Sequence, residues 1–278
     1  MDSLRAIDDW PVSTAAAAVV RSDGSTAGVH GPVNRPFMLA SVTKLLTAYA
    51  VLVAVEEGAL ELDQPAGPEG STVRHLLAHT SGLAFDERRA MAAPGTRRLY
   101  SNAGFDVLAE TLEAAAGMAF PAYVAEAVLQ PLGMAATHFH AEAKSLAGAG
   151  GVSTAADLAR FAAELQAEQP KVLHPSTLRA ATREVAFPGL SGVLPGLGHQ
   201  RPNDWGLGFE IRDGKSPHWT GGLSSPGTYG HFGQSGTFLW VDPAAGAACV
   251  ALTDRSFGDW SKEAWPAFTD GVLRELGV

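Results

Sequence analysis

Several features that define common classes of protein are absent from this sequence of 278 residues. It contains one cysteine, Cys249, which excludes an internal disulfide framework. No apolar run approaches the roughly 20 residues that a membrane-spanning helix needs. The first residues include Asp2, Asp8 and Asp9 and lack the basic start and apolar core of a secretory signal. The sequence therefore predicts a cytoplasmic protein with no membrane partner.

Clusters of basic residues are also scarce. The chain has 29 acidic and 20 basic residues and a formal charge of −9, and a surface of that sign repels phosphate backbones. No Gly-x-Gly-x-x-Gly or Walker A sequence is present. His138-Phe139-His140 offers two imidazoles but no third metal ligand at a fixed spacing. The sequence predicts no nucleic-acid partner, no cofactor and no resident metal, and it leaves the oligomeric state open.

The hydrophobic periodicity changes twice along the chain. Alternation typical of strands occupies residues 14–30 around a turn at Asp23-Gly24, and it returns in several segments after residue 204. Between them the pattern is mostly helical. It begins with a continuously apolar helix expected from Ser41 to Glu57 and closed by Gly58. Because this helix is apolar nearly all round, we expect it in the middle of a core.

These segments predict an α+β fold. Strands from both ends of the chain are expected to form one antiparallel sheet flanked by helices, with a mainly helical region inserted between them. The predicted domains are residues 1–58 with 205–278 for the sheet, and 59–204 for the helical region with its active-site loops. Residues 188–202 are rich in glycine and proline and are expected to form a surface loop. The remaining expected strands are 205–212, 229–232, 237–241 and 247–253, and the remaining expected helices are 72–78, 102–116, 121–129, 154–168 and 258–276.

Ser41-Val42-Thr43-Lys44 is the first group of residues with chemical potential. Residues three apart on a helix lie on one face, so Lys44 would reach the Ser41 hydroxyl. A serine is a weak nucleophile until a neighbour removes its proton. A lysine buried in an apolar helix loses charge stabilisation and becomes a competent base. The pair therefore predicts an activated serine, although the motif is too short to be specific alone.

Two further groups lie later in the chain. Tyr100-Ser101-Asn102 comes where a loop enters a helix, and its phenol and amide would transfer a proton and orient a substrate. Gly230-His231-Phe232-Gly233-Gln234 lies on an expected strand, where flanking glycines often mark the close approach of a ligand. Taken separately, a packed tyrosine at a helix start and a structural histidine explain these residues as well.

Together and in this order, the three motifs resemble the signature set of the serine β-lactamase and penicillin-binding-protein superfamily. The chain is similar to the class C-like branch, which includes family VIII carboxylesterases and D-stereospecific peptidases. The resemblance extends over roughly residues 14–276 and includes three further segments, Leu76–Leu83, Gly150–Leu158 and Trp205–Phe209.

The resemblance implies a role for each motif residue. Ser41 would be the nucleophile that accepts the acyl group, and Lys44 and Tyr100 would form the proton-transfer pair, with the identity of the formal base open. Acyl transfer would then proceed through a covalent intermediate that water hydrolyses.

The other motif residues would bind the substrate. Asn102 would orient it, and His231 and Gly233 would line the site opposite Ser41. The backbone N–H groups of Ser41 and Gln234 would form the oxyanion hole.

One departure from the family pattern bears on the substrate. Where members that recognise penicillins have Lys-Thr-Gly, this chain has His231-Phe232-Gly233 and offers neither the lysine charge nor the threonine hydroxyl that binds a carboxylate. We therefore expect a serine hydrolase, most simply a carboxylesterase, acting on a small ester, amide or lactam. A β-lactamase or D,D-carboxypeptidase/D-aminopeptidase is the alternative. A non-catalytic ligand-binding relative is a third reading, and the intact Ser41, Lys44, Tyr100 and Asn102 argue against it.

Overall fold

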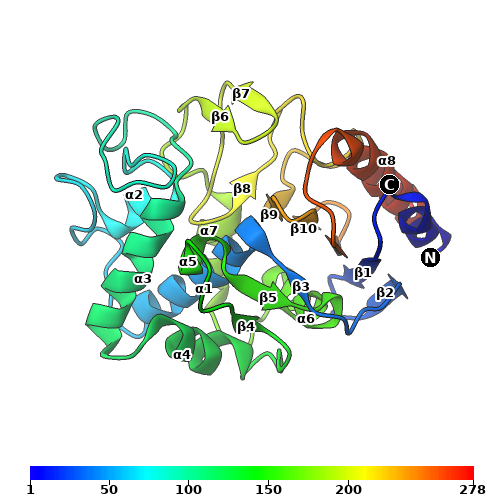
Figure 1. Ribbon diagram of the computed structural model, residues 1–278, viewed down its shortest axis with the longest axis horizontal. Helices are drawn as coiled ribbons and strands as arrows, with labels where there is room; N and C mark the ends of the chain where they lie inside the picture. The colour runs from blue at the N-terminus through cyan, green and yellow to red at the C-terminus, as the bar shows by residue number, and fades with distance from the viewer.

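Strands from the two ends of the chain form a six-stranded antiparallel sheet in the computed structural model, which describes residues 1–278 (Figure 1). Strand β1 pairs with β11 from Ala15 opposite Thr253 to Arg21 opposite Ala247, so the N-terminal strands extend the C-terminal ones. The predicted α+β fold is confirmed. Across the sheet the order is β2 (Thr26–His30), β1 (Ala15–Arg21), β11 (Ala247–Thr253), β10 (Thr237–Asp242), β9 (Tyr229–Gly233) and β8 (Glu210–Ile211).

Alternate residues of the central strands enter two separate hydrophobic clusters. On β10, Leu239 belongs to a cluster of 47 buried residues, whereas Phe238 and Trp240 belong to another of 19. This follows from the period of two by which strand side chains alternate between faces. The larger cluster includes α6 (Ala155–Gln166). The smaller one is covered by α8 (Asp259–Leu276) and the 3-10 segment η1 (Asp2–Asp9), which lie together at the end of the molecule that carries both termini (Figure 1).

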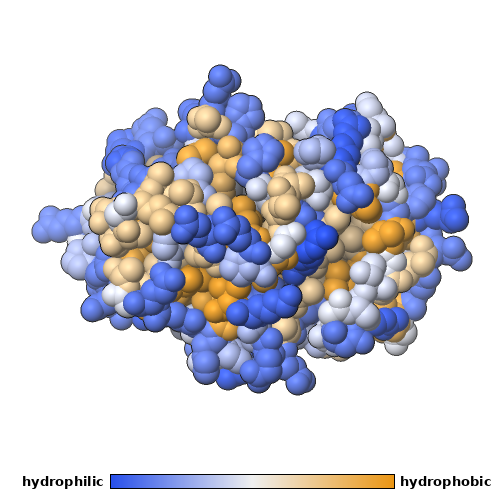
Figure 2. All heavy atoms as spheres, turned by 90° about the horizontal axis from the view of Figure 1, so that it is seen from below, coloured by the Kyte–Doolittle hydropathy of each residue, from blue (hydrophilic) through white to orange (hydrophobic).

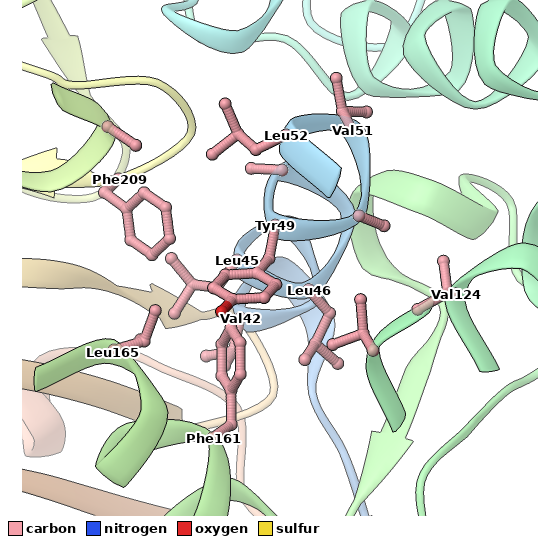
Figure 3. Close-up of a cluster of buried hydrophobic side chains, with 14 of the residues drawn as sticks. Val42, Leu45, Leu46, Tyr49, Val51, Leu52, Val124, Phe161, Leu165 and Phe209 are labelled. Carbon is pink, nitrogen blue, oxygen red and sulfur yellow. The ribbon is translucent and has the colours of Figure 1, made fainter. Parts of the chain in front are cut away.

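Helix α1 (Thr43–Glu56) lies in the middle of the larger cluster, as its mostly apolar sequence predicts. Its side chains meet neighbours on several sides, including Phe161 and Leu165 of α6 and Phe209 (Figure 3). The chain leaves the helix at Gly58, which adopts the left-handed conformation that glycine favours, with φ of 75°. A helix held on all sides is a rigid support for residues at its N-terminal end, where Ser41 and Lys44 lie.

The helical region between the N-terminal strands and β8 contains the expected helices, together with short strands and two further helices that were not expected. A small sheet, β3–β5–β4, joins it to the start of α1, because β3 pairs with β5 from Phe37 opposite Ser153 to Met38 opposite Val152. Besides α1, α6 and the hairpin of residues 192–200, its helical and strand segments are β3 (Phe37–Met38), the 3-10 turn η2 (Ala40–Val42), α2 (Val73–Leu77), α3 (Asn102–Ala116), α4 (Phe120–Val124), the π-helical segment η3 (Ala125–Leu129), β4 (His138–Phe139), α5 (Leu146–Ala149), β5 (Gly151–Ser153) and α7 (Pro175–Arg183).

Two expectations were wrong in part. Residues 205–209 do not continue β8, because Gly206 N–H donates to the Phe209 carbonyl and Gly208 has a φ of 89° in the resulting turn. A Cβ at Gly208 would come within 2.1 Å of the Cβ of Ala48, so the turn lies directly against α1. The expected loop 188–202 contains a hairpin formed by β6 (Gly192–Leu194) and β7 (Gly198–Gln200).

The outer surface carries no long apolar helix. No single helix is long and apolar enough to cross a membrane, and the one pair that passes by length and composition, Asn102–Ala116 with Phe120–Leu129, is bent by 80°. Figure 2 shows a face with hydrophilic residues around its margin and hydrophobic areas between them. Apolar groups of this kind are an ordinary part of a folded protein surface.

Candidate active site

Ser41 lies in the 3-10 turn η2, immediately before α1 rather than within it. The preceding Ala40 has a φ of 46°, a strained conformation for a residue with a side chain and one that concentrates at functional sites. The Ser41 hydroxyl is half-buried and lies 3.4 Å from Lys44 Nζ. Since N–H groups in the first turn of a helix lack an acceptor within that helix, this turn presents both a hydroxyl and a free donor.

Lys44 is completely buried, and its Nζ lies 2.5 Å from Asn102 Oδ1 and 2.7 Å from the Gly148 carbonyl oxygen. Burial penalises the ammonium and lowers the pKa of Lys44 to about 7, although the carboxylates of Asp106 and Asp86 oppose the shift. A neutral amine has two N–H donors and one lone pair. With both donors directed to these oxygens, the lone pair is free to accept a proton from Ser41.

Tyr100 and His231 form the opposite wall, with Tyr100 Oη 3.1 Å from His231 Nε2. His231 Nδ1 lies 2.6 Å from the Phe232 carbonyl oxygen, which can only accept, so Nδ1 carries the proton and Nε2 accepts from the tyrosine. Burial lowers the pKa of His231 to about 3 and raises that of Tyr100, so both groups are neutral near pH 7. Lys44 is therefore the one group of this set whose protonation changes near neutrality.

Asn102 is held in a single orientation by its neighbours. It begins α3, which Ser101 caps by accepting a hydrogen bond from Gly104 N–H. Its amide Nδ2 donates to Asp86 Oδ1 at 2.8 Å, which leaves Oδ1 for Lys44. A carboxylate cannot donate, so Asp86 determines which end of the amide faces the lysine.

Gly233 and Gln234 bring the end of β9 against the turn that carries Ser41. A Cβ at Gly233 would lie 2.2 Å from the Leu39 carbonyl oxygen and 2.6 Å from Thr237 Oγ1, so only glycine fits there. The next backbone N–H, that of Gln234, has no hydrogen-bond acceptor within the chain. It is available as the second donor of the predicted oxyanion hole.

We expect Gly233→Ala to push β9 away from the Ser41 turn. Activity should fall roughly tenfold or more because small displacements of reacting groups are costly. Overpacking at this buried position should lower the free energy of unfolding by about 1–3 kcal/mol. Steady-state kinetics and urea denaturation measure these effects. Gly222→Ala is the matched control, since a Cβ there has only one heavy atom within 4 Å, at 3.8 Å. Equal behaviour of the two variants would contradict the close approach at Gly233.

Phe232 faces away from this site. It is 6% exposed and packs in the smaller cluster, where its ring centroid lies 4.8 Å from that of Phe257 and 5.9 Å from that of Trp219. The alternation of β9 thus directs His231 and Phe232 to opposite faces. Phe232 thus replaces the threonine of penicillin-recognising members with a side chain that packs in the core, whatever the preference for substrate.

Three residues around Lys44 and Asn102 were not anticipated from the sequence. Asp86 accepts a hydrogen bond from Asn102 Nδ2, the Gly148 carbonyl oxygen accepts one from Lys44 Nζ, and the carboxylate of Asp106 acts on Lys44 through its charge. The sequence carried a signal for Gly148, because it lies among small residues. In the structure, a Cβ at this position would lie 3.2 Å from Asn102 Oδ1. The two aspartates lie on a loop and a helix far from Lys44 in sequence, and no local pattern indicates them. No group of three or more His, Cys, Asp or Glu side chains is placed to hold a metal ion.

The carboxylate of Asp106 gives the site a testable pH dependence. A base acts when it is deprotonated, so kcat/KM should rise with pH through about 7, the pKa of Lys44. Asp106 stabilises the ammonium form, and Asp106→Asn should therefore move this rise to lower pH by about half a pH unit or more. A pH profile of kcat/KM tests this, with the exposed Asp259→Asn as control. A shift to higher pH would exclude Lys44 as the titrating group.

Comparisons with known proteins identify the family of the chain. A family model described as Beta-lactamase matches residues 11–272. The crystal structure of a β-lactamase (Mb2281c) from Mycobacterium bovis is 55% identical and covers 99% of this chain and 100% of its own, with a TM-score of 0.95.

Two curated relatives are more distant. Esterase EstB from Burkholderia gladioli is 28% identical over 85% of this chain and 81% of its own length. The D-alanyl-D-alanine-carboxypeptidase/endopeptidase AmpH from Escherichia coli strain K12 is 27% identical over 161 residues, 44% of this chain. The match spans only 42% of the length of AmpH.

Proposed function

Since this chain belongs to the β-lactamase family of serine hydrolases, we propose that it is an esterase that cleaves small esters through a covalent acyl intermediate on Ser41. The observation that carries the proposal is the uncharged wall opposite the serine. His231 stands where penicillin-recognising members have a lysine, and both of its ring nitrogens are already engaged, by the Phe232 carbonyl and by Tyr100. It supplies no positive charge for a carboxylate next to the reacting carbonyl.

In the proposed first step, the Ser41 hydroxyl attacks the ester carbonyl and passes its proton to neutral Lys44. The N–H groups of Ser41 and Gln234 stabilise the oxyanion of the tetrahedral intermediate. Tyr100 protonates the departing alcohol and is reprotonated from Lys44. Ser41 is left esterified, and the alcohol is released.

In the second step, water attacks the acyl-Ser41 carbonyl and gives up one proton to the base formed by Lys44 and Tyr100. The acid product leaves, and the proton returns to Ser41. Asn102 supports both steps, because its side-chain amide oxygen accepts a hydrogen bond from Lys44 at the edge of the site. Each bond broken is thus matched by one formed, with no cofactor required by the scheme.

The relatives support an ester substrate without deciding it. EstB, the curated relative that matches most of this chain, is named an esterase. AmpH is named a carboxypeptidase and endopeptidase, but its match covers less than half of either chain. The Mycobacterium bovis protein is named a β-lactamase. Lactam and peptide hydrolysis are therefore the outcomes against which the proposal is tested.

The decisive experiment measures steady-state turnover of p-nitrophenyl acetate and of the cephalosporin nitrocefin by the purified protein. Mass spectrometry of the quenched reaction locates the acyl group. Ester turnover, with an acetyl group on the peptide that contains Ser41 and little nitrocefin turnover, is the expected result. Faster nitrocefin turnover would replace the esterase with a β-lactamase. A single stoichiometric burst without steady state would favour a ligand-binding relative.

A further inference from the structure

A groove of about 490 Å³ runs beside Tyr100, between the loop of residues 83–99 and the β6–β7 hairpin. The two walls are joined by the hydrogen bond from Arg98 N–H to the Ser191 carbonyl, at 3.1 Å. The ring of Phe85 stacks on that of Tyr100, with centroids 5.8 Å apart. The groove therefore begins at a ring that belongs to the catalytic group.

The lining of this groove is unusually apolar for a surface. Phe85, Met91 and Val193 are 49%, 52% and 55% exposed, and they are three of the seven large hydrophobic residues that the protein exposes. A concentration of exposed apolar side chains in a concave surface marks a ligand groove. A hydrocarbon chain bound here would cover these three side chains, and their removal from water would make binding more favourable.

The charge of the groove is opposite to that of the protein. Three arginines line it and no acidic residue does, whereas the whole chain carries −9. Arg98 is buried, and its guanidinium donates only to backbone carbonyls, among them those of Asn203 and Ala78. Arg89 contacts Glu87 at 3.3 Å, whereas the exposed Arg97 takes part in no ion pair. The positive charge of Arg97 is therefore available to pair with an anionic ligand.

From this arrangement we infer that the groove binds the acyl part of the substrate, and that preferred substrates are esters whose apolar acyl chain ends in a carboxylate. The inference rests on the proposed esterase function. The hydroxyl of Tyr100, which gives its proton to the departing alcohol, points to His231. The groove lies on the other side, where the Tyr100 ring faces Phe85. The alcohol and the acyl chain would therefore leave the reacting carbon in different directions.

This arrangement places the anion far from the reacting carbonyl. The wall at His231 is neutral, so a carboxylate close to the ester bond finds no cation there, whereas the exposed Arg97 in the lining of the groove offers one. A terminal carboxylate and an apolar chain would be recognised by different parts of one groove, which makes the two contributions separable by mutation.

The first test compares kcat/KM for two p-nitrophenyl esters of equal acyl length, the hexanoate and the monoester of hexanedioic acid. Arg97→Gln should lower the value for the acid-terminated ester about fivefold and leave that for the hexanoate within about twofold. Arg5→Gln, a remote exposed arginine, is the control. Met91→Gln should raise KM for both esters alike. An unchanged ratio of the two esters in Arg97→Gln would overturn the inference.

The second test separates the groove from catalysis by measuring binding to Ser41→Ala, which cannot form the acyl intermediate. Calorimetry with octanoate and octanol gives the two dissociation constants. Adding Arg97→Gln should weaken octanoate about fivefold and leave octanol unchanged. No saturable binding of either compound, or an equal loss for both, would refute the groove assignment. Turnover of the hexanoate abolished by Ser41→Ala would still uphold the esterase.

Discussion

Replacing Ser41 with alanine is expected to lower ester turnover roughly a thousandfold or more, because no other group can form the acyl intermediate. The hydroxyl interacts only with Lys44 Nζ, at 3.4 Å, and with the Tyr100 side chain, and it does not cap α1. The variant should therefore fold normally, with a free energy of unfolding within about 1 kcal/mol of the original. Steady-state kinetics and urea denaturation measure the two effects on the same sample.

Ser22→Ala provides the matched control for this variant. Ser22 is exposed, lies at the turn between β1 and β2, and its side chain takes part in no hydrogen bond. Both its turnover and its stability should equal those of the unmodified protein. Residual activity above about one tenth in Ser41→Ala would show that another nucleophile does the chemistry.

The features predictable from the sequence are those encoded locally. The helix over α1 follows from an unbroken apolar run, and its closure at Gly58 from a glycine that adopts a positive φ. The pairing of β1 with β11 follows from period-two patterns at both ends of the chain. Ser41 and Lys44 are three residues apart, so their contact also follows from helical geometry.

The features that escaped prediction depend on contacts between distant segments. Residues 205–209 alternate like a strand, but Gly208 packs against Ala48 and the chain turns there. Glycine and proline in 188–202 mask the β6–β7 hairpin, which is held in place by the loop that ends at Arg98. Asp86 determines the orientation of Asn102 from 16 residues away, on a loop that has no regular period.

Lys44→Met is expected to remove turnover while the protein still folds. Methionine retains the unbranched apolar stem that α1 buries, but its sulfur is no base at this site, and loss of a general base costs about 10²–10⁴ in rate. The two oxygens that accept hydrogen bonds from Lys44 Nζ, Asn102 Oδ1 and the Gly148 backbone carbonyl oxygen, lose their donor. Two unsatisfied buried acceptors should cost about 1–3 kcal/mol each.

The same variant should reveal the cost of the buried charge through its pH dependence. The pKa of Lys44 is about 7 in the folded protein against an ordinary value of 10.5, so between these pH values the unfolded chain binds more protons. Stability then rises with pH across this interval, by at most about 1.4 kcal/mol per pH unit, and the full cost of burying the ammonium applies below it. Lys44→Met has no such group and should lack this rise.

The difference in free energy of unfolding between the original protein and Lys44→Met should therefore grow in favour of lysine from about pH 7 to about pH 10. Urea denaturation at several pH values measures it, and Lys262→Met, on the exposed face of α8, is the control that should leave the pH dependence unchanged. Parallel curves for the original and Lys44→Met would mean that Lys44 stays charged throughout this range. It would then hold the Ser41 hydroxyl by donating to it, and the proton would have to pass to Tyr100 instead.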